Sequence, residues 1–250
     1  MSNTNTNAKT GHNENVTNLN SLIVWIPTFG AAYDPSNASL SHANLIILAS
    51  AGQTVNTAVD ACFIVWQNSV TSRSSVFEVL PSIMSRSINA LEVSGAPDQT
   101  IAQGKALARD VAGRRASARL TEEEIAAEKA LGIETRQVTM HKSSFNSKTD
   151  NFSKYVLFMA AVPEYIPNEV DITVAALQDL LADMKAENAS ILSSDTAHGA
   201  AISNRNVLLY KDDTGLVDTA IKVKKYIKSA FGVSSPQYKQ ISDLAFTKIK

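Results

Sequence analysis

The sequence predicts an all-α protein made of two tandem helical-bundle repeats, each similar to a four-helix bundle, joined by an exposed linker. Three observations lead to this prediction. Apolar residues recur with the 3.6-residue period of amphipathic helices over most of the chain. Similar residues recur at an offset of 132 positions, and a polar segment separates the two similar parts. We expect the repeats at residues 18–114 and 150–250, and the linker at residues 115–149.

The first repeat is expected to contain a short helix near residues 18–30, a long helix over residues 39–72 and further helices beyond it. Pro81 lies within the apolar stripe that follows, which predicts a kink there or a helix that starts near this residue. That stripe consists of Val76, Leu80, Ile83, Met84, Ser87, Ile88 and Leu91.

The linker contains one further helix signal. Thr121 and Glu124 have the spacing of a capping box, so we expect a short helix that starts here and ends before Gly132. The residues that follow are polar and rich in Ser and Lys. The linker is therefore expected to be exposed.

The second repeat is expected to open with a helix near residues 150–162 and a long helix over residues 169–199. Asn168 is the expected N-cap of the long helix, with Asp171 completing a capping box. Four helices packed antiparallel would bury the apolar stripes of such a repeat.

The end of the second repeat carries clear helix signals. A helix from Leu216 to Ala230 is expected to stop at Gly232. Ser235 and Pro236 have the pattern of an N-cap followed by proline at the first helical position, which predicts a last helix.

The offset of 132 residues relates specific positions of the two repeats. Tyr33 and Pro35 correspond to Tyr165 and Pro167, and after an insertion in the second repeat Pro97 corresponds to Pro236. The same offset pairs Leu40 with Ile172, Ala43 with Ala175, Leu45 with Leu177, Leu48 with Leu180, Asn56 with Asn188, Val59 with Ile191 and Arg73 with Arg205. This agreement predicts a tandem duplication.

Five segments carry a resemblance to a known family. They are Ile88–Leu91, Tyr165–Glu169, Thr214–Asp218, Val223–Gly232 and Ser235–Gln240. Over roughly residues 18–250 the chain resembles an uncharacterised family of duplicated, all-helical bacterial proteins of similar length. The resemblance implies a helical, duplicated fold and transfers no catalytic or binding residue. The stretch over residues 58–70 is more apolar here than the family would lead one to expect.

The composition excludes several classes of protein. The 250 residues contain one cysteine, so no disulfide can form within the chain. Ten glycines and seven prolines exclude a collagen-like chain, and an aromatic content of 6% is low for a β-sandwich. A net charge of −1, from 23 basic and 24 acidic residues, gives no general reason to expect binding to nucleic acid or membranes.

The N-terminal residues bear on localisation. Residues 1–17 are rich in Asn and Thr, which predicts a disordered lead. They contain no apolar core of the kind that a secretory signal requires, and the chain has no uninterrupted run of 18 apolar residues. We expect no transmembrane segment and, by default, a cytoplasmic protein, with unconventional export left open.

No constellation of residues is typical of an enzyme. The four histidines lie far apart, and no group of His, Cys, Asp and Glu has the spacing of a metal site. Ser193, Ser194, Asp195 and His198 contain the residue types of a nucleophile and base, but without a strand–turn–helix elbow a helix end or loop is the better interpretation. Glycine-rich phosphate loops are absent. We expect no enzyme activity and no cofactor or metal.

The clearest functional signal is a gap in the charge distribution. No Lys or Arg occurs between Thr10 and Ser72, and the long helix of the first repeat carries Asp60 as its one charge. The corresponding residues of the second repeat, 171–204, contain six acidic or basic residues. The loss of charge therefore belongs to one copy of the helix.

A bundle helix needs only one apolar stripe, so surplus apolar residues on a second face predict burial against another surface. The candidate interface residues are Ile46, Phe63, Ile64, Trp66 and Val70. The other surface could belong to the second repeat, to another copy of the chain or to a membrane. We favour a non-enzymatic structural or interaction protein that self-assembles into an oligomer or filament through this helix.

Basic residues suggest an alternative function. They cluster within residues 105–119 and 222–239, where helix ends and solvent faces commonly carry cations. The alternative is a contact with the phosphates of nucleic acid or with another anionic surface. The candidate anion contacts are Arg109, Arg114, Arg115, Lys224, Lys225 and Lys228.

Overall fold

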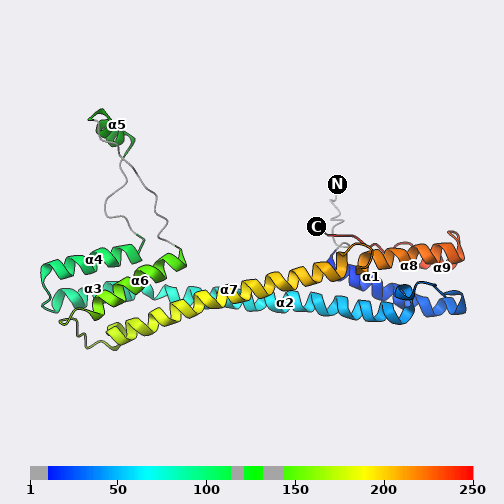
Figure 1. The fold of residues 1–250 in the computed structure, drawn as a ribbon, viewed down its shortest axis with the longest axis horizontal. Coiled ribbons are helices and arrows are strands. Elements are labelled where there is room, and N and C mark those ends of the chain that lie inside the picture. The colour runs from blue at the N-terminus through cyan, green and yellow to red at the C-terminus, as the bar shows by residue number, and fades with distance from the viewer. Residues whose placement is uncertain (1–10, 114–120, 132–143, 250) are drawn as a thin grey trace, which may run out of the picture. The chain divides into compact units, whose positions relative to one another are not determined.

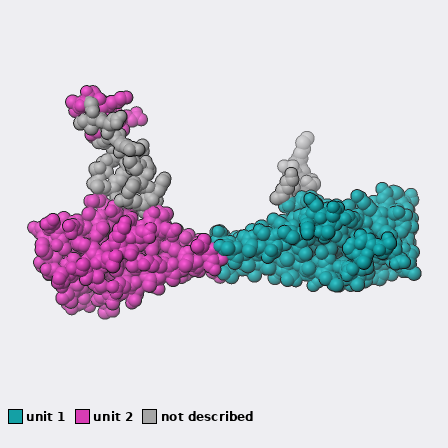
Figure 2. Space-filling view, viewed as in Figure 1, with its two compact units in different colours: residues 1–67, 194–250 teal, residues 68–193 magenta. Residues whose placement is uncertain are grey.

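A computed structural model describes residues 11–113, 121–131 and 144–249, and every regular element in these ranges is an α-helix or a short 3₁₀-helix (Figure 1). The predicted all-α class is confirmed. The chain divides into two compact units (Figure 2). Unit 1 comprises residues 1–67 and 194–250, and unit 2 comprises residues 68–193.

Unit 1 is built from the two ends of the chain. Its elements are α1 (His12–Trp25), the 3₁₀-helices η2 (Ile26–Ala32) and η3 (Ala38–Leu40), the first part of α2 (His42–Glu78), the last part of α7 (Val174–Tyr210), α8 (Leu216–Phe231) and α9 (Pro236–Ile241). Helix α8 packs against α1, α9 and η3, and α1 also contacts α9.

Unit 2 is built from the middle of the chain. Its elements are the last part of α2, α3 (Leu80–Val93), α4 (Asp98–Val111), α5 (Glu122–Ala130), α6 (Phe145–Ala160), the 3₁₀-helix η4 (Val170–Ile172) and the first part of α7. Helix α4 packs against α6 and α3, and α3 contacts η4. Helix α5 buries none of its residues.

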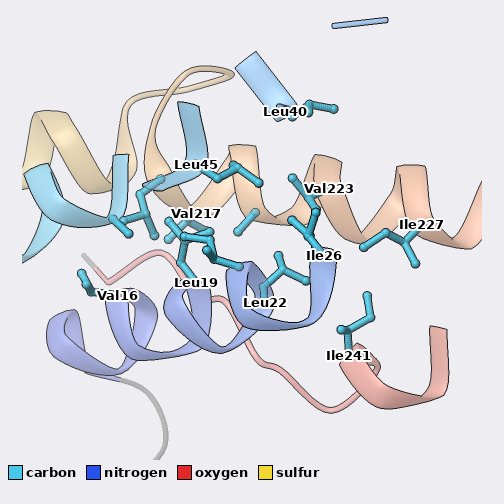
Figure 3. Packing of buried hydrophobic residues seen from close by; sticks show 14 of the residues in the cluster. Val16, Leu19, Leu22, Ile26, Leu40, Leu45, Val217, Val223, Ile227 and Ile241 are labelled. Atoms are coloured by element: carbon cyan, nitrogen blue, oxygen red, sulfur yellow. The ribbon is translucent and has the colours of Figure 1, made fainter. Parts of the chain in front are cut away.

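The core of unit 1 forms around one face of α1. Leu19 and Leu22 are fully buried and belong to the same apolar cluster as Val217, Val223 and Ile227 of α8 (Figure 3). Helix α2 approaches this core closely at Gly52, where an added Cβ atom would lie 2.9 Å from Leu216 Cδ1. Burial of each large apolar side chain stabilises the unit by about 1.5–3 kcal/mol.

The core of unit 2 forms around α6. Phe152, Tyr155 and Met159 recur at helical spacing and are fully buried. The Tyr155 hydroxyl lies 2.7 Å from Ser87 Oγ of α3, so this buried polar group has a partner. Burial raises the pKa of Tyr155 to about 12.

Helices α2 and α7 run antiparallel in each unit. In unit 2, Ser69 Oγ lies 3.3 Å from Ser190 Oγ, and Ser72 Oγ donates to Glu187 Oε1 at 2.8 Å. In unit 1, an added Cβ atom at Gly52 would lie 3.6 Å from Leu209 Cδ2. Serine and glycine therefore stand at contact positions of this helix pair, where long helices usually place larger apolar residues.

Several helix ends agree with the sequence. The side chain of Ser235 accepts a hydrogen bond from Tyr238 N at 3.1 Å, and α8 ends at Gly232, whose φ is 86°. The capping box of Thr121 and Glu124 opens α5. These predictions are confirmed, as is a helix that starts beside Pro81, because α3 begins at Leu80.

Three helix starts differ clearly from the sequence prediction, and one of them is that of α6, which begins at Phe145 rather than near residue 150. Asn168 is not the N-cap of α7, because η4 intervenes and Thr173 Oγ accepts from Ala176 N at 3.2 Å instead. Helix α1 begins at His12, earlier than the expected residue 18. Its first turns are held by Asn15, whose side chain exchanges two hydrogen bonds with the backbone of Thr247, at 2.9 and 3.0 Å.

The compact units divide the chain differently from the expected repeat ranges. Residues 18–114 supply most of α1 and the first part of α2 to unit 1, and α3 and α4 to unit 2. Residues 150–250 supply most of α6 and the first part of α7 to unit 2, and α8 and α9 to unit 1. Each unit therefore takes its helices from both ranges.

Candidate functional site

An uncharged, partly apolar surface covers one side of the first part of α2. Ile46 and Ile64 are separated by 18 residues, as are Ile47 and Val65. Eighteen residues make five helical turns, so the two apolar pairs lie on one side of the helix, about 27 Å apart. We call this surface the α2 apolar face. It consists of Ile46, Ile47, Ser50, Thr54, Ala58, Ala61, Ile64 and Val65, all exposed.

The exposure of this face is large for such residues. Ile47 and Val65 are 66% and 57% exposed, and Ile46 and Ile64 are 47% and 53% exposed. Small or hydroxyl side chains lie between the two pairs. Asp60, one turn before Ile64, is the one acidic or basic residue of α2 up to Ser72.

The structure does not bring all five predicted interface residues onto this face. Ile46 and Ile64 belong to it, whereas Phe63 and the half-buried Trp66 stack with each other, at a centroid distance of 5.8 Å. Both rings also contact His198 of α7, at 5.5 and 6.3 Å. Val70 is half-buried and lies in unit 2. Sequence reasoning missed Ile47 and Val65, although the 18-residue spacing could have identified them.

One stretch in the described part of the chain, residues 42–93, is long and apolar enough to span a membrane by length and composition. It covers α2 and α3, which are separate helices in the structure. A single stretch of this kind is weak evidence for a membrane protein, because core helices of soluble proteins satisfy the same criterion.

The first basic cluster lies partly in a cavity of unit 2. Arg109 lines this cavity of about 650 Å³ together with Lys105 and Lys148. Lys105 forms an ion pair with Glu92. The predicted contacts Arg114 and Arg115 lie outside the described residues.

The second basic cluster lies in unit 1, where Lys224 has a structural role. Its Nζ atom donates to the carbonyl oxygens of Ser242 and Leu244, at 2.8 and 2.6 Å. Burial lowers the pKa of Lys224. Lys225 and Lys228 line a cavity of about 510 Å³ together with Asp243, so this cavity carries charges of both signs.

The residue types of a nucleophile and base noted in the sequence all lie within one helix. Helix α7 contains Ser193, Ser194, Asp195 and His198 in its interior. The prediction that these residues lie at a helix end or in a loop is therefore wrong. His198 packs against aromatic rings, as described above. No group of three or more metal-ligating residues within the described ranges could hold a metal ion.

His12 shows the clearest histidine contact in the described structure. Its Nδ1 atom lies 2.6 Å from the Tyr210 hydroxyl. Burial and the positive charge of Arg205 lower the pKa of His12. This contact joins α1 to α7.

No protein-family model, curated protein or solved structure matches this chain. The resemblance to duplicated bacterial proteins therefore stays a prediction.

Proposed function

We propose that this protein is a non-enzymatic structural protein that associates with further copies of itself through the α2 apolar face. The single observation that carries this proposal is the exposure of Ile46, Ile47, Ile64 and Val65 on one side of a helix whose one nearby charge is Asp60. Surface patches of this kind commonly mark interaction sites.

The charge of the face favours a second copy as the partner. A symmetric dimer joins the same surface of both subunits, so this surface must be complementary to a second copy of itself. None of the residues of the α2 apolar face is Lys, Arg, Asp or Glu, and the one charge beside it is Asp60, so two such faces meet with little like-charge repulsion. A strongly charged partner, such as nucleic acid, would find no ionic contact there.

The size of the side chains supports a measurable affinity. Each large apolar side chain contributes about 1.5–3 kcal/mol when it is fully buried. Four such side chains on each copy provide two apolar contact points, and the small residues between them allow close approach of a second helix.

Lysine substitutions test this proposal. Ile47→Lys and Ile64→Lys each place a charge within one of the two apolar pairs of the contact, and each is expected to raise the dimer dissociation constant at least tenfold. The measurement is sedimentation equilibrium over a range of protein concentrations, supported by light scattering. Val207→Lys is the matched control, because Val207 is a 61% exposed residue of α7 in the same unit.

The expected pattern is weaker association of both α2 variants and unchanged association of the control. A wild-type chain that stays monomeric up to its solubility limit would contradict the proposal. Equal weakening by Val207→Lys would also contradict it, since the effect would then not depend on the α2 apolar face.

We also propose that the chain arose by tandem duplication. In this proposal each compact unit combines helices from the first repeat with helices from the second repeat. The same brace occurs at matching positions: Tyr33 Oη donates to the carbonyl of Leu40 at 2.5 Å, and Tyr165 Oη donates to that of Ile172 at 2.5 Å. Both bonds span seven residues and close the segment before a long helix.

A second pair of contacts supports the exchange. Asn18 of α1 donates to the carbonyl of Ala245 at 2.8 Å, and Asn151 of α6 donates to that of Asp110 at 3.0 Å. In each unit the first helix of one expected repeat is thus bonded to the end of the other expected repeat. This arrangement supports an ancestor that formed a dimer of single repeats.

The basic clusters give less support to nucleic-acid binding. Lys224 uses its donors within its own unit, and Lys105 is paired with Glu92. The two clusters also belong to different compact units. Nucleic acid, or another extended anionic surface, is therefore a weaker candidate partner than a second copy of the chain.

A further inference from the structure

The cavity of about 650 Å³ in unit 2 combines an apolar floor with basic side chains. It opens among the end of α2, the helices α3 and α4, and the start of α6. The buried side chains of Phe77, Leu80, Met84 and Val111 contribute to its lining. Its volume falls within the range of about 300–1,000 Å³ that is typical of small-molecule sites.

Two cations at this cavity have no ion-pair partner among the described residues. Arg109 and Lys148 are both half-buried and come from different helices, α4 and α6. Lys105 is less available because it is paired with Glu92. Two cations that line one cavity without a counter-charge among the described residues favour an anion there.

Unit 1 offers an internal comparison. Asn15 of α1 stands three residues before Asn18, as Lys148 of α6 stands three residues before Asn151. The Asn15 side chain donates a hydrogen bond to the carbonyl oxygen of Thr247 and accepts one from its backbone N–H. In unit 2, the residue three positions before Asn151 is Lys148, which instead lines the cavity.

We propose that this cavity binds an amphipathic anion, with its acidic head on Arg109 and Lys148 and its alkyl tail over the apolar floor. Arginine presents a planar fork of donors that suits carboxylate and phosphate, and lysine adds a compact charge. Ser85 and Asn89 line the same cavity and offer further hydrogen bonds to the head. Nucleic acid does not fit this combination, because it has no alkyl tail for the apolar floor.

Calorimetric titration of the full-length protein tests the proposal with three ligands below their micellar concentrations. Dodecanoate and dodecyl phosphate represent the two head groups, and dodecanol is the uncharged control. The double variant Arg109→Gln/Lys148→Gln is expected to weaken binding of the anions about tenfold or more, because charge-assisted hydrogen bonds are lost. The matched control is Lys154→Gln/Lys185→Gln, which removes two exposed charges of unit 2 that lie outside the cavity.

Saturable binding of either anion, weakened by the cavity variant and unchanged in the control variant, supports the proposal. The head group that binds more tightly identifies the ligand as a carboxylate or a phosphate. No saturable binding of either anion overturns the proposal, as does equally tight binding of dodecanol. Equal weakening in the control variant overturns it too, because the effect would then reflect net charge alone. None of these results depends on self-association through the α2 apolar face.

Discussion

Individual glycines show where the helices approach most closely. At Gly52 an added Cβ atom would lie 2.9 Å from Leu216 Cδ1 and 3.0 Å from Val16 Cγ2, inside the core of unit 1. The favourable effect of alanine on a helix is at most about 1 kcal/mol. Overpacking of a core costs about 1–3 kcal/mol, so we expect Gly52→Ala to destabilise unit 1. Urea unfolding followed by tryptophan fluorescence measures the change, because Trp25 and Trp66 both lie in this unit.

Gly199 provides the control for this prediction. It also lies within a helix, α7 of unit 1, but an added Cβ atom would meet nothing within 4 Å. Gly199→Ala should therefore stabilise the unit by about 0.5–1 kcal/mol. Equal effects of the two substitutions would show that close approach does not decide the outcome.

Tyr155 gives a prediction for alkaline pH. Because burial raises its pKa to about 12 from the ordinary value of 10, the folded state keeps the phenol proton more tightly than the unfolded state. The resulting stability is fully present below pH 10 and is lost as the pH rises toward 12. By pH 11 we expect wild type to lose about 1 kcal/mol through this group.

The variant Tyr155→Phe isolates this effect. It removes the hydrogen bond to Ser87 and should cost about 1 kcal/mol at neutral pH, but it cannot lose a phenol proton. The stability difference between wild type and variant should therefore shrink between pH 9 and pH 11 in denaturant unfolding followed by circular dichroism. A constant difference over this range would disprove the titration of Tyr155.

At the scale of the helix, local sequence patterns predict those helix ends that are determined by residues close in sequence. Ser235, Thr121 and Gly232 act within one or two turns of the chain, so their roles could be predicted and are confirmed. The start of α1 depends instead on Thr247, at the far end of the chain. No local pattern contains that contact, so the sequence alone placed this helix start too late.

The same distinction applies to the candidate sites. The absence of charge in α2 is visible in the sequence, and Ile46 and Ile64 are indeed exposed on one face. The contact between Trp66 and His198 requires knowledge of which part of α7 lies beside α2. Four helices must meet to form the cavity of unit 2. The sequence therefore predicted Arg109 as an anion contact but not Lys148, which lines the same cavity.

At the scale of the molecule, periodicity shows that a long helix has a buried stripe but not which segment covers it. Helices α2 and α7 each contribute to both compact units, a division that no composition change marks. A predicted repeat is therefore not the same as a predicted folding unit. Each unit nevertheless has its own apolar core, one around α1 and one around α6.

Separate cores predict separate responses to core substitutions. Leu22 and Phe152 are both fully buried, in unit 1 and unit 2 respectively. Leu22→Ala should destabilise unit 1 by about 2–5 kcal/mol, and Phe152→Ala should destabilise unit 2 by about 3–5 kcal/mol.

Tryptophan fluorescence follows unit 1, whereas far-ultraviolet circular dichroism follows the helices of both units. We expect Leu22→Ala to shift the fluorescence transition strongly, and Phe152→Ala to cause an early loss of circular dichroism that fluorescence does not report. If both variants shift both signals equally, the continuous helices α2 and α7 couple the two cores into one cooperative transition.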